Sequence, residues 1–176
     1  MPGRDVLSVA ALALARAGDV AAARKLADGL NKDFPRNTIV QGYWLPSIRA
    51  GIEINAGNGR EALEALKPAA PLELGQSQPF SLGMMYPVYL RGVAFLQAGQ
   101  AKQAAAEFRK IIDQPGIVLN FPLGALAHVE LARSYAFEGD AAKARTAYQQ
   151  FLTILKGADP DIPILRQTRT ELGKLM

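Results

Sequence analysis

The chain has 176 residues, no cysteine, and 20 lysine and arginine residues against 16 aspartate and glutamate residues, a formal net charge of +4. The lack of cysteine excludes disulfides and thiolate metal sites, and it does not choose between the cytoplasm and the outer side of a membrane. The basic residues form no run interleaved with aromatic residues, which argues against nucleic-acid binding. No segment approaches the roughly 20 apolar residues that a membrane-spanning helix needs, so we expect a soluble domain, free or on a membrane-anchored parent protein.

Apolar residues recur with the helical period along most of the chain, and strand patterns are nearly absent. In chain order the pattern predicts helices at about 5–17, 20–33, 43–56, 60–67, 86–98, 101–113, 122–138, 141–156 and 162–175. Pro46 and Pro87 fall in the first turns of their helices, where a missing N–H is harmless. Asp161 is expected to cap the last helix, with Pro163 in its first turn.

A short pattern recurs four times at intervals of about 40 residues. It consists of a glycine, a polar residue and, four positions on, an alanine. The four copies are Gly18-Asp19 with Ala23, Gly57-Asn58 with Ala62, Gly99-Gln100 with Ala104, and Gly139-Asp140 with Ala144. The glycine ends one helix and the small alanine lets the next helix pack closely. We therefore expect one domain over 1–176, with helical hairpins at about 5–35, 43–70, 86–114 and 122–156 and a capping helix at about 162–175.

Further positions of each hairpin repeat in the same register. The second helices carry Ala27, Leu66, Phe108 and Tyr148 at one position and Leu30, Ala69, Ile111 and Phe151 at the next. Phe95 and Tyr135 stand late in their first helices, and Gly92 takes a small-residue position where helices cross. This set resembles the tetratricopeptide repeat family. The resemblance implies an all-α, right-handed solenoid that binds proteins or peptides in a groove lined by the first helix of each hairpin.

Several short stretches carry a narrower resemblance, which covers about residue 40 to the end. They are Tyr89-Leu-Arg-Gly92, Pro115-Gly-Ile-Val118, Pro122-Leu-Gly-Ala-Leu-Ala-His128, Tyr148-Gln-Gln-Phe-Leu152 and Ala158-Asp-Pro-Asp-Ile-Pro-Ile164. They are similar to the C-terminal tetratricopeptide region of bacterial eukaryotic-like serine/threonine protein kinases. The chain itself has no glycine-rich phosphate loop, no His-Arg-Asp and no Asp-Phe-Gly motif, so we expect no kinase activity from it. The resemblance implies a regulatory or sensing tail; a self-association module or a free-standing adaptor are the alternatives.

The groove-facing positions of such a solenoid select the ligand. On that basis the expected partner-binding residues are Trp44, Ser47, Tyr86, Tyr89, Val93, Arg133 and Phe137. Ser8 and Leu12 stand where a clamp for a peptide carboxylate would need cationic and amide side chains, so that clamp is absent. The aromatic residues favour an apolar or aromatic peptide segment. The alternative is that these rings complete the core beneath the long connectors.

The remaining polar candidates point to structural roles. His128 is the only histidine and has no second imidazole or thiol with which to share a metal, and Asp159 with Asp161 lack the other ligands of a calcium loop. Arg49 and Arg91 occupy equivalent helix positions, so we expect them to lie on the core and pair outward, or alternatively to bind an anionic ligand. We expect no catalytic residue, no metal and no cofactor.

Two connectors, Pro68–Met85 and Gln114–Phe121, are longer than a helical hairpin requires. The first is rich in apolar residues, including Pro79, Phe80, Leu82 and Met84. It is therefore expected to pack within the molecule, with a role over the groove or against a partner as the alternative.

Overall fold

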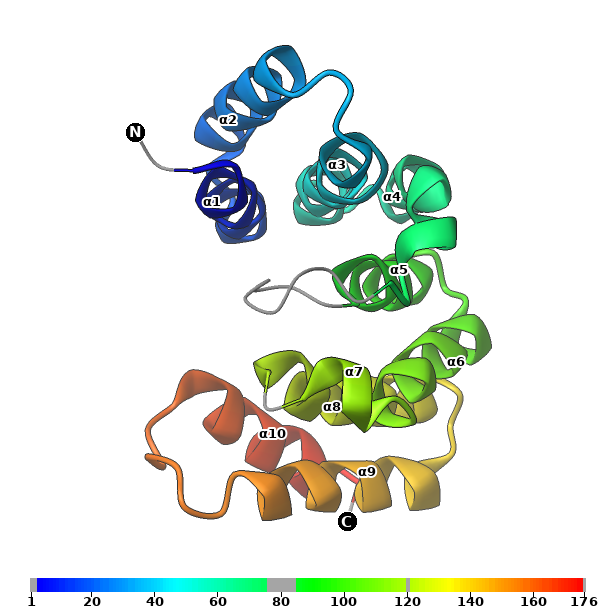
Figure 1. Ribbon diagram of the computed structural model, residues 1–176. Coiled ribbons are helices and arrows are strands. Elements are labelled where there is room, and N and C mark those ends of the chain that lie inside the picture. The colour runs from blue at the N-terminus through cyan, green and yellow to red at the C-terminus, as the bar shows by residue number, and fades with distance from the viewer. Residues whose placement is uncertain (1–2, 76–84, 120, 176) are drawn as a thin grey trace.

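The computed structural model describes residues 3–75, 85–119 and 121–175, and within these ranges the chain forms helices and turns without a strand. The helices are α1 (Arg4–Ala17), α2 (Val20–Asp33), the π-helix η1 (Val40–Trp44), α3 (Leu45–Asn55), α4 (Gly59–Leu66), the 3-10 helix η2 (Lys67–Leu72), α5 (Tyr86–Gln97), α6 (Ala101–Ile112), α7 (Pro115–Val118), α8 (Pro122–Phe137), α9 (Ala141–Ile154) and α10 (Pro163–Gly173). Figure 1 shows how they follow one another along the array.

The long helices form two curved layers. Helices α1, α3, α5 and α8 make the inner layer, and α2, α4, α6 and α9 make the outer layer (Figure 1). Each inner helix packs on its own outer helix and on the next inner helix. Because the layers curve, α1 and α8 border the same inner face although they belong to the first and last hairpins. The predicted all-α, tetratricopeptide-like solenoid is confirmed.

The four predicted turn glycines end their helices in the left-handed backbone region. Their φ values are 89° at Gly18, 79° at Gly57, 74° at Gly99 and 81° at Gly139. Such values are readily reached by glycine and are strained for other residues. The alanine that follows each turn, at positions 23, 62, 104 and 144, is completely buried. The repeat pattern thus marks the places where the chain reverses and where the second helix buries a small side chain.

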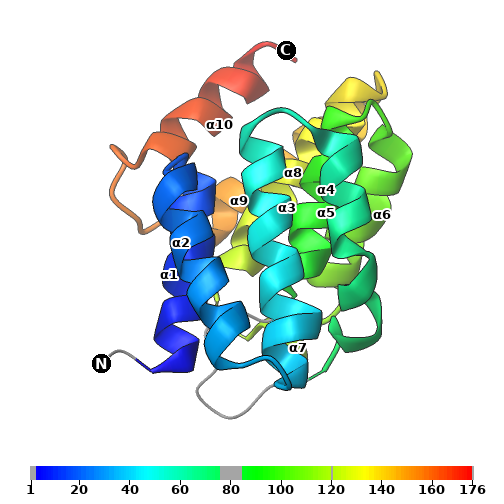
Figure 2. The ribbon, with the colours of Figure 1, turned by 90° about the horizontal axis from the view of Figure 1, so that it is seen from above.

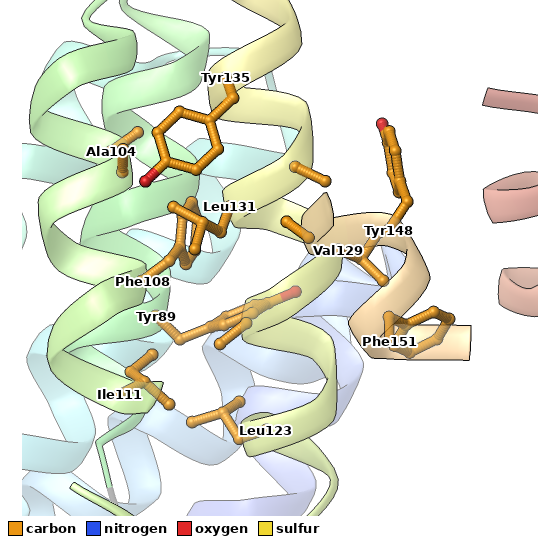
Figure 3. Packing of buried hydrophobic residues seen from close by; sticks show 14 of the residues in the cluster. Tyr89, Ala104, Phe108, Ile111, Leu123, Val129, Leu131, Tyr135, Tyr148 and Phe151 are labelled. Carbon is orange, nitrogen blue, oxygen red and sulfur yellow. The ribbon is translucent and has the colours of Figure 1, made fainter. Parts of the chain in front are cut away.

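The core consists of two buried clusters that meet at α5. One buried cluster joins the first two hairpins to α5, and a second joins α5 to the rest of the chain. Tyr86 and Val93 of α5 pack against both clusters. Figure 3 shows the second cluster, where Phe108 and Ile111 of α6 lie between α5 and α8. The second-helix positions predicted from the register are all buried.

The segment before α3 begins earlier than predicted. It is helical from Thr38, and its π-helical part ends directly before Leu45 and Pro46. Pro46 has no N–H to donate, and in a regular α-helix its ring would press on the carbonyl of Gly42. The wider π turn accommodates the proline, so Pro46 lies inside a longer helical segment.

Both connectors contain short helices that the sequence did not predict. η2 (Lys67–Leu72) opens the first connector, and α7 (Pro115–Val118) fills the centre of the second. Pro79, Phe80, Leu82 and Met84 lie outside the described residues. In the described part of the first connector, Glu73 accepts a hydrogen bond of 2.6 Å from Arg91 of α5. This part therefore packs within the molecule.

The predicted cap of the last helix is wrong, although Pro163 does lie in its first turn. Ile162 precedes the helix, and no side chain caps it. A residue before proline is pushed toward an extended backbone, and Ile162 has a ψ of 124°. Asp161 is therefore displaced one residue from the capping position. Its own N–H donates to Asp159 Oδ1 at 2.9 Å.

We expect opposite effects from glycine-to-alanine substitutions in α5 and α2. An added Cβ at Gly92 would lie 2.6 Å from the ring of the fully buried Phe108, whereas Gly29 has nothing within 4 Å. Alanine favours helix over glycine by up to about 1 kcal/mol. Gly29→Ala should therefore raise the free energy of unfolding by about 0.5–1 kcal/mol, and Gly92→Ala should lower it by about 1–2 kcal/mol because of overpacking. Urea unfolding measures both, and a gain at Gly92 would contradict the packing argument.

Candidate functional site

A cavity of about 200 Å³ lies on the inner face between α1, α5 and the start of α8. We call it the inner-face pocket. It is lined by Leu12, Arg16, Tyr86, Tyr89, Leu90, Phe121, Pro122, Leu123 and Leu126. The curvature of the array creates it, because its walls come from the first, third and fourth hairpins. Tyr86 and Tyr89 are the two expected partner-binding residues that line it.

A row of aromatic rings supports one wall of the inner-face pocket. Trp44 packs edge-on against Tyr43 at 5.3 Å and lies 6.2 Å from Tyr86, whose ring meets Phe121 edge-on at 5.9 Å. Trp44 is only 4% exposed and Tyr86 is half-buried. The N–H of Tyr86 donates to the Tyr43 hydroxyl at 3.2 Å. Tyr86 is therefore held from both sides. Trp44 does not line the pocket itself, but it supports the Tyr86 ring that does.

Three other expected partner-binding residues lie away from the pocket lining. Ser47 is completely buried, and its hydroxyl donates to the backbone carbonyl of Tyr43 at 2.7 Å. Val93 is partly buried between the two core clusters. Phe137 is 64% exposed at the end of α8. The three residues thus occupy a fully buried, a half-buried and an exposed environment.

Arg133 meets the last helix of the chain. Its Nε donates to Glu171 Oε2 and its Nη2 to Glu171 Oε1, each at 3.0 Å. Its Nη1 donates to Glu130 at 2.8 Å, and the Tyr148 hydroxyl donates to Glu171 at 2.8 Å. A bidentate, charge-assisted pair of this kind is among the stronger polar contacts in proteins. Arg133, one of the expected partner-binding residues, therefore binds the Glu171 carboxylate of the same chain.

The pKa values of this network follow from burial and from Arg133. Burial raises the pKa of Glu130, with Arg133 acting in the opposite direction. Burial also acts to raise the pKa of Glu171, but hydrogen bonds from Arg133 and Tyr148 outweigh it and lower the pKa. Burial raises the pKa of the Tyr89 hydroxyl, which stays protonated and faces Glu130 at 3.4 Å. At neutral pH the network thus keeps Glu171 ionised and Tyr89 neutral.

Arg16 is a pocket residue that the sequence reading did not single out. It is exposed at the rim, and within the described ranges its guanidinium has no ion pair. Its charge reaches the inner face, because it lowers the pKa of both Tyr89 and Glu130 against the effect of burial. Arg16 lies four residues after Leu12 on α1, so continuing the groove register by one turn would have found it.

The other polar candidates lie outside this pocket. His128 lines a separate apolar cavity of about 570 Å³ between α6, α8 and α9. Burial lowers its pKa, opposed by a hydrogen bond with the Gln150 side chain. Arg91 pairs with Glu73 at 2.6 Å and with Glu107 at 2.7 Å, which confirms the predicted pairing, whereas Arg49 is exposed. No group of three or more potential metal-ligating side chains occurs among the described residues.

Comparison with known families adds one finding. Residues 127–154, which span most of α8 and all of α9, match the family described as tetratricopeptide repeat. The fourth hairpin is similar to a tetratricopeptide repeat. No curated protein and no solved structure matches the chain. Tetratricopeptide repeats generally mediate protein–protein interactions. Among the described helices, none has the length and apolar character needed to cross a bilayer.

Proposed function

We propose that this tetratricopeptide-like array is a protein-interaction module that binds a partner segment in the inner-face pocket. The segment places one apolar or aromatic side chain in the pocket and an acidic group beside Arg16. The observation that carries the proposal is an apolar cavity with an exposed arginine at its rim that forms no ion pair with the described residues. Aromatic and arginine residues supply much of the binding energy at protein interfaces.

The size of the pocket favours a single side chain as its occupant. Pockets for whole small molecules usually measure about 300–1,000 Å³, and this cavity is about 200 Å³. Its wall is also held in place before binding, since Tyr86 is packed between Trp44 and Phe121. A wall that does not need to be ordered on binding loses less conformational entropy. These features support recognition of a peptide anchor residue.

Peptide selection tests the proposal directly. The chain is used to select binders from a library of random peptides, and we expect enriched sequences with an apolar or aromatic residue near aspartate or glutamate. Arg16→Glu and Leu126→Arg should each weaken binding of an enriched peptide at least tenfold. Arg60→Glu on the outer helix α4 provides a control of the same charge change, and it should leave binding unchanged. Equal binding by all three variants would contradict the proposal.

Self-association is the competing use of the same face. Light scattering over a concentration series separates the two. A mass that stays monomeric while peptide binding persists supports the module with a free pocket. If the chain forms a homodimer, and Arg16→Glu or Leu126→Arg dissociates it, the inner face serves self-association and the peptide-binding proposal is contradicted.

We further propose that the array is the regulatory tail of a bacterial serine/threonine protein kinase. The support is the sequence resemblance of Pro115–Val118, Pro122–His128 and Ala158–Ile164 to that region of such kinases. An immunoblot of native cells with an antibody against this chain tests the proposal. A band far above 18.9 kDa that also carries kinase activity is expected, and a band at 18.9 kDa would contradict it.

A further inference from the structure

The last helix, α10, is attached to the array through a small interface. It packs on α9; Leu165 and Thr168 are buried, and Ile164 and Leu172 are partly buried against the core. Figures 1 and 2 show it at the end of the array, inclined to the other helices and joined to α9 by an irregular segment. Its residues Arg166, Gln167, Arg169 and Thr170 are exposed. Separating this helix from the array would therefore expose less buried surface than separating any inner helix.

The surface beneath α10 contains a built carboxylate site. Arg133 of α8 and Tyr148 of α9 together make three hydrogen bonds of 2.8–3.0 Å to the carboxylate of Glu171. Glu130 holds the other side of the Arg133 guanidinium at 2.8 Å. The planar guanidinium is thereby oriented by α8 itself, and it presents two parallel N–H groups to whichever carboxylate lies opposite.

The fit of α10 to this surface is incomplete. Leu165 is 1% exposed and contributes to the core cluster, so the surface accepts an apolar side chain there. Three residues on, the Thr168 hydroxyl is buried, and it has no hydrogen-bond partner among the residues that the structure describes. A buried hydroxyl that has lost water and gained no partner opposes binding. The surface would therefore accept a helix with an apolar residue at this position better than it accepts α10.

We propose that the surface of α8 and α9 beneath α10 is a docking site for a partner helix. The partner carries an apolar residue, a second apolar residue three positions later, and a glutamate three positions after that. This pattern repeats the positions of Leu165, Thr168 and Glu171, with the unpaired hydroxyl replaced. In the isolated chain α10 fills the site as a tethered competitor. The docking site lies outside the inner-face pocket, although Tyr89 of the pocket contacts Glu130 at its edge, and the proposal does not depend on the function proposed for the pocket.

A partner helix must compete with α10, which the segment after α9 keeps close to the site. A segment joined by a short flexible linker has an effective concentration in the millimolar range. An external helix of equal intrinsic affinity therefore binds the intact chain weakly, and its apparent affinity rises as α10 is weakened. Direct binding of a peptide with and without an intact α10 measures this difference.

The test uses a fluorescent peptide of residues 159–175 that carries Thr168→Val, and fluorescence anisotropy with the full chain. The peptide should bind the full-length Leu165→Ala variant at least tenfold more tightly than the unmodified chain, because that substitution weakens the tethered helix alone. Adding Arg133→Met to Leu165→Ala should abolish binding. A peptide that also carries Glu171→Gln should bind at least tenfold more weakly.

Controls separate the docking site from the inner-face pocket and from misfolding. Tyr86→Leu should leave peptide binding unchanged, because Tyr86 lines the inner-face pocket and, among the described residues, takes no part in the hydrogen bonds around Arg133 and Glu171. Circular dichroism must show the helix content of the array retained in each variant, and Glu171→Gln in the full chain replaces Leu165→Ala if that variant unfolds. The proposal is overturned if neither weakened variant binds the peptide more tightly than the unmodified chain. It is also overturned if amides of α10 exchange as slowly as those of α8.

Discussion

Phe108→Ala is expected to lower the free energy of unfolding by about 3–5 kcal/mol, the range for removing a fully buried aromatic side chain. Phe108 is completely buried and meets Tyr89 edge-on at 5.8 Å. Gly92 leaves no Cβ against its ring, so α5 approaches the ring through the backbone. The cavity would open between α5 and α6, in the middle of the array (Figure 3).

Phe137→Ala is the matched control, because Phe137 is 64% exposed. It should change the free energy of unfolding by less than about 0.5 kcal/mol. Urea unfolding followed by circular dichroism gives both values. Since stability in a repeat array is summed from hairpins and their interfaces, Phe108→Ala should also separate the unfolding of the two ends. Equal losses from the two substitutions would contradict the importance of this contact.

Arg91→Met is expected to lower the free energy of unfolding by about 3 kcal/mol. The guanidinium joins Glu73 at 2.6 Å and Glu107 at 2.7 Å, and the two carboxylates are only 12% and 9% exposed. Removing one partner of a buried ion pair costs about 3–5 kcal/mol because a buried charge is left behind. In the variant, Lys110 still pairs with Glu107 at 2.7 Å and partly compensates its charge. The expected loss of stability is therefore at the lower end of this range.

Arg49→Met tests whether this loss comes from the ion pairs or from the removal of any arginine at that helix position. Arg49 occupies the equivalent position of α3 and is exposed. Its substitution should change stability by less than about 0.5 kcal/mol. Thermal unfolding of both variants measures the difference. Combining Arg91→Met with Glu107→Gln should recover part of the loss, and no recovery would contradict the role of the uncompensated charge.

The repeat pattern was sufficient to predict the hairpins because it encodes local backbone geometry. Gly18, Gly57, Gly99 and Gly139 each mark a left-handed turn, and helical periodicity defines what lies between them. The same local reasoning misplaced the cap at Asp161, because Pro163 controls the backbone of the residue before it. Short helices such as α7 carry too few residues for periodicity to reveal them.

The candidate site was only partly predictable because it depends on the curvature of the array. The groove register led to Tyr86 and Tyr89, which do line the pocket. The opposing wall comes from Leu12 and Arg16, and no local pattern says that α1 reaches the start of α8. The pairing of Arg133 with Glu171 joins residues 38 positions apart and depends on where α10 folds back. Such contacts follow from tertiary packing, which sequence register alone does not specify.

The position of the inner-face pocket gives the array a mechanical property. Its two walls, carrying Leu12 and Leu126, are separated by more than 100 residues of chain, so the distance between them depends on the angles between the successive hairpins. A small bend distributed over the hairpin interfaces would widen the pocket, and pulling on the ends of the array would abolish it. Under the binding mode proposed above, a ligand that touches both walls would crosslink the two ends of the array, so binding would stiffen the array and tension on its ends would favour release of the ligand.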